Sequence, residues 1–234
     1  MSEVSPRWTN AGTVAGFETG QPNQVLLEFA KRFAQAGAAP RCLDIGCGAA
    51  RNALPLAALG FRVSATDLSA PMLEGAKRRI AGATPQPAVD LVRAPMAPLP
   101  FADAGFDLIV AHGIWNLARS GVEFRAAVAE AARVARPGAG LFVFTFSRHT
   151  LGPAAVPDAG ESFVFSSWNG EPQCFLTEPE LLRELASAGF ERADPGPLTE
   201  YNVPRPGELR AGGPPVIYEG TFVKQSTVRP VSLR

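Results

Sequence analysis

Short apolar runs of strand length alternate with stretches of helical period through most of this chain. The runs are rich in leucine, aromatic and β-branched residues, and they occupy residues 41–46, 61–67, 89–94, 106–112 and 140–147. This alternation is typical of β-α-β units, whose parallel strands are buried on both faces. We therefore expect an α/β fold with right-handed crossovers.

The stretches between these runs carry helix start and stop signals. They predict helices over residues 50–60, 69–82, 122–138 and 177–190. Ser69 and Pro71 open the second helix, and Pro137 with Gly138 is expected to end the third. Thr177 followed by Glu180 has the spacing of a capping box, which predicts the start of the fourth.

The pattern changes after the fifth apolar run. Residues 148–176 form a segment rich in glycine, proline, serine and aromatic residues, which we predict to be an insertion. Residues 191–201 and 214–225 are interpreted as two strands of an antiparallel hairpin, within 191–226, that closes one sheet edge. We expect residues 1–234 to form a single domain.

Composition excludes some classes of partner and location. Twenty-two Lys and Arg balance 22 Asp and Glu, so the chain lacks the positive field that attracts nucleic acid or anionic lipid. The three cysteines form no C-x-x-C pair, which favours reduced thiols. The chain begins without a signal-peptide pattern and has no membrane-length apolar stretch, so we expect a cytoplasmic protein.

The stretch "CLDIGCGAARN", residues 42–52, places a glycine-rich turn after the first predicted strand. In open α/β sheets, ligands bind at the carboxyl ends of the strands, and Gly46 and Gly48 let the backbone approach a ligand closely. Asp67 ends the second predicted strand, where a carboxylate can accept both ribose hydroxyls. A nucleoside-containing ligand is therefore predicted.

Two residues discriminate between possible nucleosides. A dinucleotide fingerprint has a third glycine where this chain has Arg51, so pyrophosphate binding is poorly supported. Asp44 places a negative charge near the turn, which suits a ligand with an ammonium and a sulfonium group. S-adenosylmethionine carries both groups.

The segment "LDIGCGAARNALPLAALGFRVSATDLSAPML" resembles the first two motifs of class I S-adenosylmethionine-dependent methyltransferases. "GCGAARNALPLA" is similar to the tellurite-resistance and ubiquinone-biosynthesis-like branches of this family. The resemblance continues through "APLPFADAGFDLIVAHGI", "ARVARPGAGLFVFTFS" and "FLTEPELLRELASAGFE", and covers roughly residues 25–195. It implies a Rossmann-like, mostly parallel seven-stranded sheet with helices on both faces, with S-adenosyl-L-methionine as cofactor.

The resemblance also implies roles for individual residues. Asp44, Gly46, Cys47 and Gly48 would hold the methionine end of the cofactor, and Asn52 of the same motif is assigned to the cofactor site. Asp67 would bind the ribose, Leu68 and Met96 would contact the adenine, and Ala111 and His112 would lie beneath the methyl group. Two positions depart from the family pattern: Ala50 replaces a common glycine, and Pro95 replaces an acid that accepts from the adenine amino group.

Methyl transfer requires an acceptor aligned with the sulfonium, and a general base where the acceptor carries a proton. His112 ends the fourth predicted strand and His149 follows the fifth, both at the cofactor edge, so they are candidate bases, although each is also typical of packing. Two histidines make no metal site, and none is predicted. Candidate acceptor contacts are Phe17, Trp115, Asn116 and Trp168, and for Trp115 a core position is the alternative.

The sequence therefore predicts methyl transfer to a small-molecule acceptor by a monomer or homodimer, with residues 1–24 as a lid. One alternative is a non-catalytic S-adenosylmethionine-binding module or partner subunit, since fold alone does not establish catalysis. A less favoured alternative is an NAD(P)-dependent oxidoreductase, against which Asp44 and Arg51 both argue.

Overall fold

A central sheet dominates the computed structural model, which describes residues 5–34, 39–203 and 213–226. Within these residues the strand order is β3-β2-β1-β4-β5-β10-β8, and β9 pairs with β10 as an eighth strand. The strands are β1 (Arg41–Ile45), β2 (Arg62–Asp67), β3 (Val89–Arg93), β4 (Phe106–His112), β5 (Ala135–Phe146), β8 (Phe190–Arg192), β9 (Thr199–Tyr201) and β10 (Ile217–Lys224).

The first five strands run parallel to one another, as the sequence predicts. The C-terminal strand β10 is antiparallel to β5 on one side and to β8 and β9 on the other. The predicted antiparallel closure of the sheet edge is thus confirmed. The first predicted strand of the hairpin, residues 191–201, is divided into the two short strands β8 and β9. Residues 204–212 of that hairpin lie outside the described residues.

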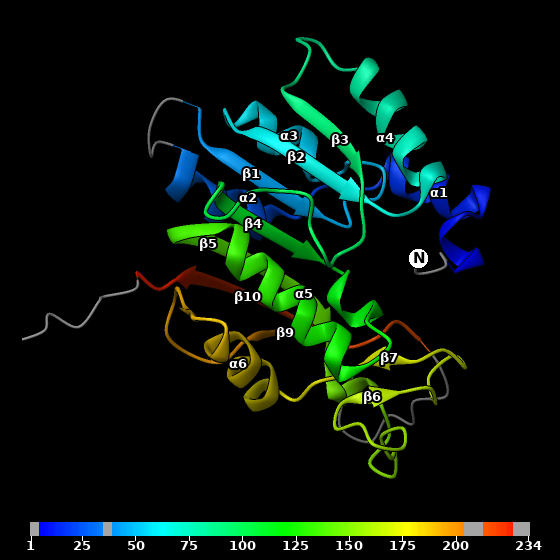
Figure 1. Cartoon of the computed structure of the whole chain (residues 1–234). Helices are drawn as coiled ribbons and strands as arrows, with labels where there is room; N and C mark the ends of the chain where they lie inside the picture. The colour runs from blue at the N-terminus through cyan, green and yellow to red at the C-terminus, as the bar shows by residue number, and fades with distance from the viewer. Residues whose placement is uncertain (1–4, 35–38, 204–212, 227–234) are drawn as a thin grey trace, which may run out of the picture.

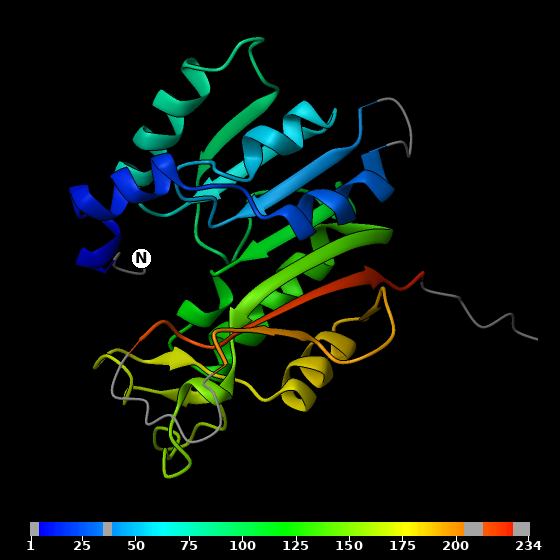
Figure 2. The ribbon, with the colours of Figure 1, turned by 180° about the vertical axis from the view of Figure 1, so that it is seen from behind.

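Helices cover both faces of the sheet (Figures 1 and 2). On one face α5 (Gly121–Val134) and α6 (Glu178–Ser187) pack over a core that includes Ile109, Phe124 and Leu185. On the other face α2 (Gln24–Ala34), α3 (Ala53–Ala58) and α4 (Ala70–Ala81) bury a second core. The predicted class of fold is therefore confirmed.

The third predicted helix ends earlier than expected. It stops at Val134, and β5 begins at Ala135, before Pro137 and Gly138. The loop ahead of β4 explains the difference, because its Ala104 and Gly105 N–H groups donate to the carbonyls of Arg133 and Val134 at 2.9 and 2.8 Å. These carbonyls bind the neighbouring loop, so the chain passes directly from helix to sheet.

Two additions to the sheet lie at the carboxyl ends of its parallel strands (Figure 1). The N-terminal segment contains the short helix η1 (Pro6–Trp8) and α1 (Ala11–Thr19), and α1 packs against α4. The insertion contains η3 (Arg148–Thr150) and a two-stranded sheet of β6 (Val164–Phe165) and β7 (Gln173–Cys174). Another short helix, η2 (Trp115–Leu117), follows β4 and packs against β7. Together these segments surround the sheet edge where a ligand is expected.

All three cysteines are buried and free, in agreement with the predicted reduced thiols. Burial raises the pKa of the Cys42 and Cys47 thiols well above the ordinary value. Within the described residues we find no helix with the length and apolar character needed to cross a bilayer.

The capping box at the start of α6 offers a test of local stability. Thr177 Oγ1 accepts from the Glu180 N–H, and the Glu180 carboxylate accepts from the Thr177 N–H. We expect Thr177→Ala to lower the free energy of unfolding by about 1 kcal/mol, measured by urea denaturation. Ser187→Ala, at the exposed end of the same helix, is the matched control. A loss no larger than that of the control would contradict a stabilising cap.

Candidate functional site

A cavity of about 880 Å³ lies at the carboxyl ends of β1, β2 and β4. Its walls come from the N-terminal segment, the turns after these strands, the end of β5 and the insertion. The cavity brings together eight of the predicted site residues: Phe17, Gly46, Gly48, Asp67, Leu68, Met96, His112 and Asn116.

The turn after β1 requires glycine at two positions. Gly46 and Gly48 have φ values of +69° and +54°, which side chains rarely adopt. A Cβ atom at Gly46 would lie 2.7 Å from Ile114 side-chain atoms, and one at Gly48 would lie 2.7 Å from Phe17 Cδ1. The glycines therefore permit both the turn itself and the close approach of the cavity walls.

The N–H groups of this turn are already used within the protein. The Cys47 N–H donates to the Thr66 carbonyl at 2.8 Å, and the Gly48 N–H donates to Asp67 Oδ2 at 2.9 Å. The turn thus fixes the Asp67 carboxylate at the end of β2. It presents that carboxylate and the glycine backbone to the cavity.

Ala50, which replaces a glycine common in the resembling family, also has a positive φ of +60°. The left-handed conformation costs a non-glycine residue about 1–2 kcal/mol. Its methyl group is fully buried in the core under α3, and such burial contributes about 1 kcal/mol. Strain and burial therefore largely offset each other at this position.

Two carboxylates lie at the β1 and β2 ends of the site. Burial raises the pKa of Asp44 to about 7, with Arg51 acting in the opposite direction and Asp67 adding to the increase. Asp44 Oδ2 is buried and has no hydrogen-bond partner among the described residues. Burial also raises the pKa of Asp67, and the N–H groups that it accepts from oppose that shift. Asp44 is thus poised to interact with a positively charged group.

His112, at the end of β4, is held as a neutral ring. Its Nδ1 lies 3.0 Å from Arg51 Nη2, and its ring stacks on Phe144 with centroids 4.2 Å apart. A guanidinium group only donates, so Nδ1 accepts and Nε2 carries the proton. Burial, together with the Arg51 charge, lowers the pKa of His112 to about 3. This geometry favours a hydrogen-bond donor or positioning role over a general base.

The neutral state of His112 can be measured directly, because the chain contains two histidines. We expect the His112 ring to remain neutral from pH 5 to pH 8 in NMR titrations, with His149→Asn to assign the signals. Arg51→Met removes a nearby positive charge, so it should raise the His112 pKa while burial still keeps it below the ordinary value. Protonation of wild-type His112 near pH 6.5 would contradict this arrangement.

A buried carboxylate lies behind His112. Glu219 of β10 is 4% exposed and accepts from Asn23 Nδ2 at 2.6 Å and from the Tyr201 hydroxyl at 2.7 Å. Asn23 Nδ2 also lies 3.5 Å from His112 Nε2. The hydrogen bond to Glu219 raises the pKa of Tyr201 to about 12. In the tautomer with the proton on Nε2, Asn23 Nδ2 and His112 Nε2 both donate, so the contact between them is not a hydrogen bond, and Glu219 of β10 fixes Asn23 beside His112.

The N-terminal segment covers the cavity from residue 5 onward, and residues 1–4 of the predicted lid lie outside the described residues. Ser69 Oγ donates to the Trp8 carbonyl at 2.7 Å, and the Arg51 guanidinium lies over the Phe17 ring at 5.6 Å. Arg79 of α4 donates to the Phe17 and Glu18 carbonyls at 3.2 and 2.6 Å. These contacts hold α1 over the β1 and β2 turns.

The structure places seven predicted residues outside the cavity lining: Asp44, Cys47, Asn52, Ala111, Trp115, His149 and Trp168. Asn52 Oδ1 accepts from the Asn23 N–H at 3.0 Å, so this side chain joins α3 to the start of α2. Trp115 is fully buried and packs edge-on against Phe124, as expected for a core residue. Trp168 is half-buried beside Phe175.

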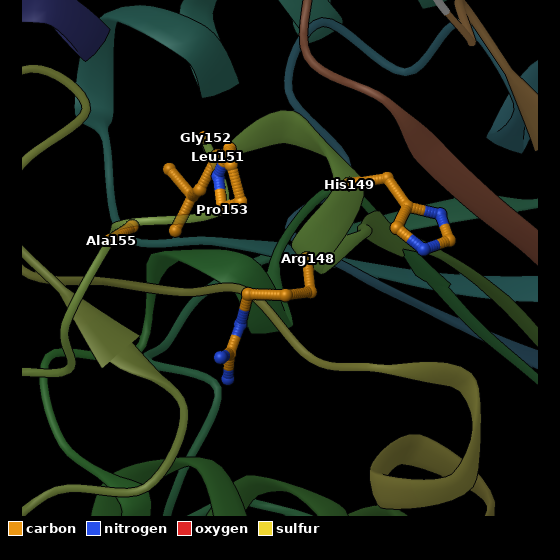
Figure 3. A pocket seen from close by; sticks show the side chains of 6 residues that line it. All are labelled: Arg148, His149, Leu151, Gly152, Pro153 and Ala155. Carbon is orange, nitrogen blue, oxygen red and sulfur yellow. The ribbon is translucent and has the colours of Figure 1, made fainter.

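His149 lies in a separate, smaller pocket of about 300 Å³ with Arg148 and the loop through Ala155 (Figure 3). Its Nδ1 is 2.9 Å from Glu200 Oε1, and its side chain is 62% exposed. Figure 3 shows the Arg148 and His149 side chains pointing in different directions. Arg148 donates to the Phe175 carbonyl at 2.8 Å. His149 therefore belongs to a local surface contact apart from the large cavity.

Sequence reasoning did not identify Thr145 and Gln173 as site residues, although both line the cavity and are almost fully buried. Their oxygen atoms Thr145 Oγ1 and Gln173 Oε1 have no hydrogen-bond partner among the described residues. No sequence motif marks them, because their position depends on how the insertion folds back on β5. Within the described chain, we find no cluster of three or more residues suited to holding a metal ion.

Comparison with known proteins finds a match over part of the chain. Residues 43–144 match the family described as "Methyltransferase domain". The demethylmenaquinone methyltransferase of Renibacterium salmoninarum is 38% identical over 120 residues, which are 50% of this chain and 46% of that protein. The chain thus spans about half the length of the curated relatives it matches first.

Solved structures agree over more of the chain. A methyltransferase structure from Methanosarcina mazei has a TM-score of 0.65 at 20% identity, covering 88% of this chain and 99% of the other. The 1,6-didemethyltoxoflavin-N1-methyltransferase of Burkholderia thailandensis has a TM-score of 0.58 at 21% identity, with 97% and 93% coverage. At these identities, the similarity establishes the fold.

Proposed function

We propose that this chain transfers a methyl group from S-adenosylmethionine to a small molecule, because residues 43–144 match a methyltransferase domain and the chain has the fold of solved methyltransferases. One observation carries this proposal: a single cavity joins the Gly46, Gly48 and Asp67 turn to an end lined by aromatic residues. A cavity of about 880 Å³ lies within the range usual for small-molecule sites.

The residues present fit S-adenosylmethionine. Asp67 lies in the cavity wall beside Leu68 and Met96, where it can accept from the ribose while the apolar side chains pack on the adenine. Asp44 lies outside the cavity lining, two residues before Gly46, and its buried Oδ2 has no hydrogen-bond partner among the described residues. Its negative charge favours the ammonium of the methionine end in the adjoining cavity. The terminal α-carboxylate of that end is expected near Arg51, whose side chain lines the same cavity.

The cofactor, when bound, supplies a methyl group already activated by its sulfonium. The residues of this chain then have to orient an acceptor and exclude water. The N-terminal segment covers the site, and Phe144, Phe146 and Ile217 provide apolar walls at the acceptor end. His112, neutral with its proton on Nε2, positions polar groups by donating a hydrogen bond.

The relatives suggest which acceptors to test. The first relatives are named for demethylmenaquinone, which supports a naphthoquinol-type ring as a starting point. We place the reaction in the cytoplasm and expect a monomer or homodimer. The similarity to the tellurite-resistance and ubiquinone-biosynthesis-like branches stays a prediction. The predicted roles of the individual site residues belong to this proposal.

Calorimetric titration tests the proposed function. We expect S-adenosylmethionine and S-adenosylhomocysteine to bind with micromolar dissociation constants and NADH, the control, to show no binding. Tight binding of NADH, together with no binding of either sulfur nucleoside, would favour the oxidoreductase alternative. Binding without methyl transfer to any acceptor of a broad small-molecule panel would favour the non-catalytic module. If folded protein bound neither sulfur nucleoside, the proposal would be withdrawn.

A further inference from the structure

The lining of the large cavity contains buried polar atoms without partners in the described residues. Asn116, Thr145 and Gln173 line the cavity, and they are 2%, 1% and 6% exposed. Asn116 Oδ1, Thr145 Oγ1 and Gln173 Oε1 have no hydrogen-bond partner in the part of the chain that the structure describes. Native proteins pair most buried polar groups, so three such side chains along one cavity need an explanation.

These three side chains come from distant parts of the sequence and are placed by packing. Asn116 belongs to η2, Thr145 to β5 and Gln173 to β7, and η2 packs against both strands. Cys174 Sγ, next to Gln173, donates to the Ala118 carbonyl at 3.3 Å and joins β7 to the end of η2. The polar groups are therefore fixed by buried elements.

The chemistry of the cluster defines what it can bind. Carboxamide and hydroxyl groups both donate and accept hydrogen bonds, and none carries a charge. Leu117, Phe146 and Ile217 line the same cavity and offer apolar surface. The charged side chains that line the cavity balance, with three arginines and three acids: Arg7, Arg51, Arg119, Asp67, Glu123 and Glu171. A charged ligand group beside the cluster would therefore lose its hydration without gaining a net counter-charge. A flat, neutral ring with a hydrogen-bonding substituent meets both the polar and the apolar surfaces.

We propose that Asn116, Thr145 and Gln173 form the acceptor subsite, and that they select an uncharged aromatic ring that bears a hydroxyl or ring N–H group. The subsite rests on the proposed function, because it defines the substrate class of the same cavity. The three groups lack partners within the described protein, and the ligand is expected to supply them.

Three probes of similar shape test the ligand class: 2-naphthol, naphthalene and 2-naphthoate. We expect 2-naphthol to bind at least ~10-fold more tightly than the other two in ligand-observed NMR titrations with saturating S-adenosylhomocysteine. Asn116→Leu and Gln173→Met should each weaken 2-naphthol binding about 10-fold and leave naphthalene and S-adenosylhomocysteine binding unchanged.

Thermal stability provides a second readout. Asn116→Leu, Thr145→Val and Gln173→Met should each raise the Tm of the free protein by about 2–4 °C, because they remove an unpaired buried polar group. Thr221→Val is the matched control, since Thr221 Oγ1 donates to Asp194 Oδ2 at 3.1 Å away from the cavity. The control should lower the Tm and leave 2-naphthol binding unchanged.

The outcomes separate the subsite from the proposed function. S-adenosylhomocysteine binding with no preference for 2-naphthol, or with no 2-naphthol binding, overturns the subsite alone. A lower Tm in Gln173→Met and Asn116→Leu also overturns it, because these side chains would then be structural. If the wild type does not bind S-adenosylhomocysteine, the proposed function itself is contradicted.

Discussion

Asp67→Ala is expected to weaken S-adenosylhomocysteine binding at least ~100-fold, because two hydroxyl hydrogen bonds to a carboxylate would be lost together. The Asp67 carboxylate lines the cavity at the end of β2, where the ribose is proposed to bind. Isothermal titration calorimetry on wild type and variant measures the change. Asp67→Asn keeps one acceptor oxygen and should give an intermediate affinity.

The control for this prediction must separate ligand contact from loop structure, because Asp67 also accepts from the Gly48 and Ser69 N–H groups. Asp90→Ala removes an exposed carboxylate from the adjacent strand β3 and should leave affinity unchanged. Circular dichroism and the Tm show whether Asp67→Ala remains folded. Wild-type affinity in a folded Asp67→Ala variant would remove the ribose contact from the proposal.

Asp44→Asn is expected to weaken cofactor binding about 10–100-fold at pH 8 and to remove its pH dependence. Burial raises the pKa of Asp44 to about 7, so the wild-type carboxyl loses its proton as the pH rises through 7. A carboxylate attracts the ammonium of the methionine end, whereas a carboxyl or amide does not. Wild-type affinity should therefore rise between pH 6 and pH 8, and that of Asp44→Asn should not.

Stability should change in the opposite direction to binding. The pKa of Asp44 is raised from 3.8 in the unfolded chain, so from about pH 4 to pH 7 the folded state retains a proton that the unfolded state releases. The free energy of unfolding thus falls as the pH rises through this range and levels off above it. Asp44→Asn removes this fall in the free energy of unfolding. Above pH 7 the variant should therefore be more stable than wild type, by at most on the order of 4 kcal/mol.

Urea denaturation at pH 5 and pH 8 measures this effect, with Asp90→Asn as an exposed control. A stabilised variant that binds the cofactor weakly would show that Asp44 serves binding at the expense of stability. If Asp44→Asn were less stable than wild type at pH 8, the carboxylate would have a partner within the folded protein, and the expected exchange between stability and binding would be wrong.

The parts of the fold that depend on local pattern could be predicted from the sequence. The apolar runs 41–46 and 106–112 correspond to β1 and β4, because strands buried on both faces must be continuously apolar. Thr177 and Glu180 define a helix start through contacts within one turn of chain. Gly46 and Gly48 could be identified because the turn restricts which residues can adopt its backbone conformation.

The parts of the fold and of the site that depend on tertiary contacts could not be predicted from the sequence. Val134 ends α5 because a loop remote in sequence binds its carbonyl, which no local signal reveals. Trp115 and Asn116 are neighbours in one short helix, yet one packs in the core and the other lines the cavity. Gln173 reaches the same cavity through the folding of the insertion. Orientation and long-range packing, which the linear pattern does not encode, decide these positions.

The position of β10 in the sheet has a consequence for biosynthesis. β10 leaves the ribosome after β8, although in the sheet it lies between β5 and β8. Seventy-one residue positions separate the end of β5 at Phe146 from Ile217, so at 5–20 residues per second β5 waits roughly 4–14 s for its partner. During that interval a newly made chain presents an open apolar strand edge and lacks Glu219. Nascent chains of this protein are therefore expected to need protection from association until β10 has inserted.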